Sequence, residues 1–145
     1  MSGLSAAEML TEEELVRGFE DGSLCEFPHA SHVRLTLVYL QRHGRDEALR
    51  RMNEGLRKFV AMKGVPEKFH VTLTQAWLDL LDSARLAHPE ADQPEMIVQA
   101  CPALLDKDAL LRFYSRDLLA SDAARTSWLP PDRAPELDAR LLRPE

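Results

Sequence analysis

The sequence predicts an all-α protein that forms a single domain. Apolar residues recur at every third or fourth position in several segments, which is the period of a helix. No segment shows the sustained apolar–polar alternation of a strand, and no hairpin signal is present. The 145 residues, 45% of them hydrophobic, match the size and composition of one globular domain. We expect a compact helical bundle of four main helices, followed by short C-terminal helices, within a single domain 1–145.

The first two predicted helices begin at recognisable signals. The helix 11–20 opens with Thr11 and Glu14, which have the spacing of a capping box. The second helix, 28–43, has a proline at its first position, where a missing N–H costs nothing, and Gly44 stops it. Both helices are therefore predicted from local chemistry at their ends.

The next two predicted helices are longer. The third helix, 45–63, carries apolar residues at helical spacing and is closed by a glycine. The fourth helix, 67–87, has a wide apolar stripe and ends at a His-Pro pair. Its stripe includes His70, so we expect this imidazole to point inward. Shorter helices are predicted at three places, namely 95–100, 106–114 and 121–127. The chain ends are predicted to be less regular tails, 1–10 and 129–145.

Charge and composition exclude several classes of partner. A formal net charge of −6 gives no basic surface for a phosphate backbone, so we expect no nucleic acid partner. No apolar run reaches the ~18–20 residues that span a bilayer, and the acidic N-terminal segment does not resemble a signal peptide, so we predict no membrane contact and a cytoplasmic location. Cys25 and Cys101 are interpreted as reduced, partly buried thiols. The composition is compatible with a homodimer.

One cluster of residues indicates a metal site. His29 and His32 lie three residues apart on the second helix, which places both imidazoles on one face. Catalytic zinc or iron sites usually need three protein ligands, and His70 is the best third candidate. Glu26 is a weaker oxygen ligand. The cofactor would be a divalent metal ion, and imidazole ligands do not separate zinc, iron and copper.

The same histidines have other interpretations. Buried imidazoles more often form hydrogen bonds in a core than bind metal, which would make the protein a non-catalytic ligand-binding or interaction module. A metal-free acid–base enzyme that uses His70 or His32 is a third possibility. Arg34 needs an anionic partner, either a substrate carboxylate or one of the 24 acidic side chains. Ser115 and Ser121 are good helix caps.

Several blocks together resemble a widespread family of small, functionally uncharacterised bacterial proteins. They are F-P-H-A-S-H-V-R, K-F-H-V-T-L-T and F-Y-S-R-D-L-L-A-S-D-A-A-R, within a likeness that covers about residues 27–135. Family members repeat F-x-H-x-x-H-(L/V)-R, (Y/F)-H-E-T-(L/I)-T and Y-S-x-x-x-L-x-S blocks. Mapped by motif, the matching residues of this chain are His29, His32, Arg34, His70, Thr72, Thr74, Tyr114, Ser115, Ser121 and Arg125.

The resemblance implies a shared site but no reaction. This chain departs from it at Val71, where similar sequences commonly carry glutamate. From these residues we expect a metal-dependent enzyme, hydrolytic or oxidative, that acts on a small anionic molecule. Arg34 or Arg125 would orient that molecule, and Thr74 or Tyr39 would support the site by hydrogen bonding.

Overall fold

The computed structural model describes residues 9–142, and within this range every regular element is a helix or a 3₁₀ turn. The α-helices are α1 (Glu12–Asp21), α2 (His29–His43), α3 (Arg45–Met62), α4 (Val71–Ala87), α5 (Pro94–Ala100), α6 (Arg116–Leu119) and α7 (Asp122–Thr126). The 3₁₀ turns are Pro66–Lys68, Pro102–Leu105, Ala109–Arg112 and Ala139–Leu141. The prediction of an all-α fold is confirmed for this part of the chain.

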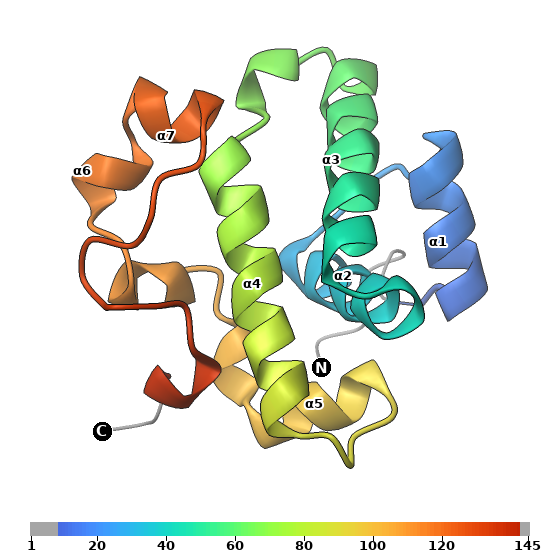
Figure 1. Cartoon of the computed structure of the whole chain (residues 1–145). Coiled ribbons are helices and arrows are strands. Elements are labelled where there is room, and N and C mark those ends of the chain that lie inside the picture. Colours follow the sequence, from blue (N-terminus) through green and yellow to red (C-terminus); the bar gives the residue numbers. More distant parts are fainter. Residues whose placement is uncertain (1–8, 143–145) are drawn as a thin grey trace, which may run out of the picture.

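Helices α3 and α4 run side by side through the molecule (Figure 1). Helix α1 packs on α2 and α3, whereas α6 and α7 lie on the opposite side of α4. Helix α5 packs near the end of α4 and contacts α2. Helices α6 and α7 and the 3₁₀ turn Ala139–Leu141 thus form a C-terminal layer on α4, whereas α5 lies against α2.

The predicted start of the first helix is confirmed in detail. The Thr11 hydroxyl accepts the N–H of Glu14 at 3.1 Å, and the Glu14 carboxylate accepts the N–H of Thr11 at 2.9 Å. At the other end, Gly22 adopts a left-handed conformation with φ 78°, which glycine tolerates best. Pro28 is the N-cap of α2 rather than its first residue.

The predicted start of the fourth helix at residue 67 is wrong. Pro66–Lys68 forms a separate 3₁₀ turn, and α4 begins only at Val71. His70 has extended backbone angles, φ −129° and ψ 110°, and is the N-cap of α4. The chain therefore bends between residues 68 and 70, and His70 does not belong to the apolar stripe of the helix.

The C-terminal part differs most from the predicted helices. Residues 106–114 form a short 3₁₀ turn, Ala109–Arg112, instead of an α-helix. Helix α6 and the 3₁₀ turn Ala139–Leu141 were not predicted. Residues 129–138 of the predicted tail are irregular and pack across the molecule, while residues 1–8 and 143–145 of the two predicted tails lie outside the described residues.

One buried core joins the long helices. Its largest fully buried side chains include Tyr39, Tyr114, Phe113, Leu35, Leu78 and Ile97. The ion pair between Arg45 and Asp79, with its shortest N–O distance at 2.9 Å, fastens α3 to α4 at the edge of this core. None of the described helices is long and apolar enough to cross a membrane.

Candidate functional site

A small hollow lies where α2 begins, between α3 and α4. Its volume is about 260 Å³. The residues that line it are Phe27, His29, His32, Leu56, Leu73, Thr74 and Trp77. We call it the histidine hollow. It brings together two of the three predicted histidines, one predicted threonine and four apolar side chains.

His29 is held by the protein at one ring nitrogen. Its Nε2 lies 3.0 Å from the carbonyl oxygen of Leu104, and a carbonyl only accepts, so Nε2 carries the hydrogen and donates it. The ring also meets Trp77 edge to face, with centroids 4.5 Å apart. Desolvation lowers the pKa of His29, and the bond to Leu104 opposes this effect. The neutral form of His29 therefore has a lone pair on Nδ1, to which no described residue donates a hydrogen bond.

His32 is the unusual residue of the hollow. Within residues 9–142 its imidazole forms no hydrogen bond, and its ring packs against that of Phe27 with centroids 5.7 Å apart. Burial lowers the pKa of His32 to about 4, and the neighbouring His29 adds to the effect. At neutral pH the ring is uncharged, so it offers one N–H donor and one acceptor to the hollow.

The two histidines lie close together, as their spacing predicted. Their ring centroids are 6.2 Å apart. Two imidazoles that share one tetrahedral metal ion have centroids about 5 Å apart, given Zn–N bonds of about 2.1 Å. The observed separation is about 1 Å longer than this, so the side chains would have to move closer together to share an ion.

The structure places His70, the predicted third metal ligand, at the start of α4. The N–H of Leu73 donates to His70 Nδ1 at 3.0 Å, which caps α4. Nε2 therefore carries the ring hydrogen and donates it to the carbonyl oxygen of Leu119 at 2.8 Å. Both ring nitrogens are committed, so His70 presents no lone pair to a metal ion in this conformation. It also does not line the histidine hollow.

The described residues 9–142 contain no group of three or more His, Cys, Asp or Glu residues placed to hold a metal ion. The predicted three-histidine set is thus divided between a hollow and a helix cap. Val71, which replaces the glutamate of similar sequences, is the first residue of α4.

The other predicted site residues are also divided. Thr74 is buried at the hollow, and its hydroxyl donates to the main-chain oxygen of His70 at 2.8 Å. Arg34 lies outside the hollow and donates from Nη1 to the carbonyl of Leu10 at 2.7 Å, with its Nε 3.7 Å from a carboxylate oxygen of Glu95. Arg125 also lies outside it, on α7, beside Asp122.

The remaining residues of the family resemblance form hydrogen bonds within the C-terminal layer or, in the case of Thr72, between α4 and that layer. The buried Thr72 hydroxyl donates to Ser127 O at 2.8 Å and accepts the N–H of Leu129 at 3.1 Å. Tyr114 donates to the carbonyl of Leu129 at 2.8 Å. Ser115 and Ser121 cap α6 and α7, which confirms their interpretation as caps.

Sequence reasoning missed the apolar walls of the hollow. Leu56, Leu73 and Trp77 all stand at helical spacing and are indistinguishable from core residues in the sequence. Phe27, directly before the proline that caps α2, was part of a motif but carried no role. The available signal in the sequence was the pair His29 and His32 next to the large apolar residue Phe27.

Comparisons with family models, with curated proteins and with solved structures found no match for this chain. The family resemblance therefore stays a prediction that rests on its motifs alone.

Proposed function

We propose that this protein binds a small, mostly apolar molecule with one polar group in the histidine hollow. The observation that carries the proposal is His32, a neutral imidazole without a hydrogen bond at the edge of a hollow lined by apolar side chains. Among the described residues, the nitrogens of His32 are not buried unpaired atoms, so they are reachable from the hollow, and a ligand there can supply the hydrogen-bond partner that the protein does not.

The walls of the hollow define the chemistry of the ligand. Four of the seven lining residues are aromatic or aliphatic, and the polar ones are two neutral imidazoles and a hydroxyl already engaged with the main chain. Neither Arg34 nor Arg125 lines the hollow, so an anion would lack a cationic partner there. An uncharged ligand with a hydroxyl or carbonyl group fits this lining better than the anionic molecule expected from the sequence.

The size of the hollow favours a ligand of about one ring. Its volume of about 260 Å³ is slightly below the ~300–1,000 Å³ of drug-sized pockets. Trp77 and Phe27 supply aromatic surfaces against which a ring packs at little cost in entropy. A phenol is the simplest molecule with these properties.

The test is a titration of p-cresol followed by isothermal calorimetry. We expect saturable binding that weakens in His32→Phe, which removes the polar contact, and disappears in Leu56→Trp, which fills the hollow. Ala61→Trp is the matched control, because it adds the same side chain at an exposed position of α3. Binding that is as tight in Leu56→Trp as in Ala61→Trp would contradict the proposal.

The second candidate function is binding of one divalent transition metal ion by His29 and His32. Their proximity, 6.2 Å between ring centroids, favours it, and so do their lowered pKa values, because the neutral imidazole is the form that binds metal. Zinc, iron or copper would supply Lewis-acid or redox chemistry at the open positions of such a site, which would make the protein an enzyme.

Elemental analysis of the untagged protein beside the double variant His29→Ala/His32→Ala tests this candidate. About one ion per chain in the wild type, lost in the variant, supports metal binding. A wild type that holds no metal after loading with zinc, iron or copper contradicts it. The expected cytoplasmic location and a homodimer stay predictions.

A further inference from the structure

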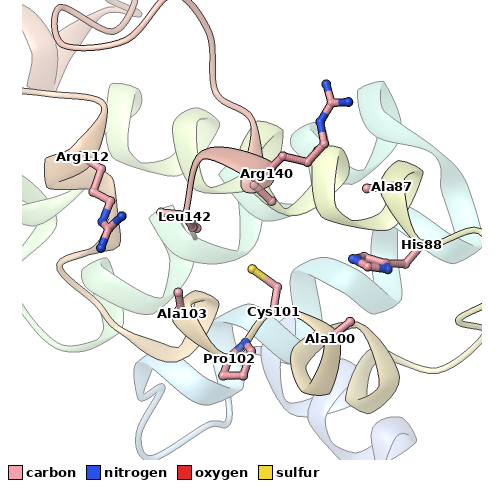
Figure 2. Close-up of a pocket in the computed structure, with 10 residues that line it drawn as sticks. Ala87, His88, Ala100, Cys101, Pro102, Ala103, Arg112, Arg140 and Leu142 are labelled. Carbon is pink, nitrogen blue, oxygen red and sulfur yellow. The ribbon is translucent and has the colours of Figure 1, made fainter. Parts of the chain in front are cut away.

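A second and larger cavity lies at the opposite end of α4 from His70. Its volume is about 590 Å³, within the range of about 300–1,000 Å³ that small-molecule pockets occupy. Figure 2 shows its walls, which come from the end of α4, the end of α5, the 3₁₀ turn Pro102–Leu105 and the C-terminal turn Ala139–Leu141. No residue of the histidine hollow lines it.

The lining of this cavity is mainly small and apolar. Alanines such as Ala100 and Ala103, together with Leu142, form much of the wall. The Cys101 thiol points into the open space, and the His88 ring lies across from it (Figure 2). Burial raises the pKa of the Cys101 thiol, so it stays protonated and uncharged at neutral pH. A molecule in the cavity would therefore contact an uncharged, polarisable sulfur atom.

Charged groups at the rim are largely paired with neighbouring carboxylates. Arg140 donates to both carboxylate oxygens of Asp138, at 2.7 Å from Nη2 and 3.1 Å from Nε. His88 Nδ1 lies 3.5 Å from a carboxylate oxygen of Glu90. Arg112 contributes a second guanidinium to the lining (Figure 2). Paired cations attract an anion weakly, so apolar contact is the main source of binding energy here.

We propose that this cavity is a second binding site, separate from the histidine hollow, and that it takes a small uncharged apolar molecule in contact with the Cys101 thiol. Its size exceeds that of the hollow more than twofold, 590 against 260 Å³. The two sites therefore accept molecules of different size.

A matched pair of fluorescent probes tests the site and its charge preference. N-phenyl-1-naphthylamine is uncharged, and 1-anilinonaphthalene-8-sulfonate is the same framework with one negative charge. The uncharged probe is expected to bind saturably and about tenfold more tightly than the sulfonate. Equal or tighter binding of the sulfonate overturns the proposed ligand class, and no saturable binding of either probe overturns the site.

Variants locate the bound probe. Ala103→Phe fills the cavity and Ala100→Trp blocks its exposed rim, and each is expected to weaken the uncharged probe at least about tenfold. The rim position is exposed, so this second variant keeps the test valid if the first one does not fold. Leu56→Trp and Ala61→Trp are expected to leave the affinity unchanged. If Leu56→Trp loses the probe and Ala100→Trp still binds it with wild-type affinity, the probe lies in the histidine hollow and the proposal is overturned.

Cysteine chemistry gives an independent measurement. Cys25 is exposed and serves as an internal standard for the partly buried Cys101. With N-ethylmaleimide and peptide mass spectrometry, a saturating amount of the uncharged probe is expected to slow alkylation of Cys101 at least about tenfold and to leave Cys25 unchanged. An unchanged rate at Cys101 would show that the probe does not contact the thiol and would overturn the proposal.

Discussion

Replacement of His70 separates a structural histidine from a metal ligand. In His70→Ala, the N–H of Leu73 loses its cap and the carbonyl of Leu119 loses its donor. Loss of a cap costs about 1 kcal/mol, and loss of the donor to the partly buried carbonyl about 1–2 kcal/mol. We expect a loss of about 2–3 kcal/mol in the free energy of unfolding. For a chain of 145 residues this lowers Tm by roughly 7–10 °C.

The assay is urea denaturation followed by circular dichroism. His70→Asn restores a capping side chain but not the bond to Leu119, so it should recover about 1 kcal/mol. His43→Ala is the control, because this histidine is exposed at the end of α2, and its effect should stay below about 0.5 kcal/mol. If His70→Ala is no less stable than the control, the assignment of His70 as a helix cap is refuted.

Three further predictions concern the core, the hollow and the C-terminal layer. Gly55→Ala places a methyl group 1.9 Å from an atom of the buried Phe19 ring. The free energy of unfolding should fall by about 1–3 kcal/mol, although alanine has the better helix propensity. Unchanged stability would contradict the close packing of α1 on α3. The pKa of His32 is lower in the folded protein than its value of about 6.5 in the unfolded chain. The free energy of unfolding should therefore fall as the pH drops below 6.5, by at most about 2 kcal/mol between pH 7.5 and pH 5. Urea unfolding of His32→Gln at several pH values should show a smaller pH dependence of stability than the wild type. The same pH dependence in both proteins would disprove the contribution of His32. Thr72→Val leaves two main-chain groups unpaired and should lower the unfolding free energy by about 2–4 kcal/mol, whereas the exposed control Thr126→Val should cost under about 0.5 kcal/mol; equal losses refute the role of Thr72.

Local signals predicted the helices that have strong ends. The capping box at Thr11 and the glycines after α1, α2 and α3 all act through a few neighbouring residues, and the structure uses them as expected. The start of α4 was misplaced because histidine is not a usual capping residue. Its capping geometry depends on Leu119, 49 residues away, and no local pattern contains that contact.

The candidate site was predictable only in its polar part. The spacing of His29 and His32 predicts their proximity, because three residues on a helix lie on one face. His70 was predicted on the apolar stripe of the fourth helix, but α4 begins only at Val71. The hollow itself depends on packing between α2, α3 and α4, and the cavity beside Cys101 depends on the C-terminal chain returning to α4. Such long-range contacts leave no periodic signal in the sequence.

The most direct measurement uses the five histidines as reporters. Ring ¹H–¹³C spectra of histidine-labelled protein would be recorded during titrations with p-cresol and, separately, with zinc. We expect saturable shifts of His29 and His32 with p-cresol, while His43 and His70, which line neither cavity, stay unchanged. If zinc shifts the signals of His29 and His32 and p-cresol does not, the metal site is favoured and small-molecule binding in the hollow is contradicted. No shift of His32 with either titrant would contradict both.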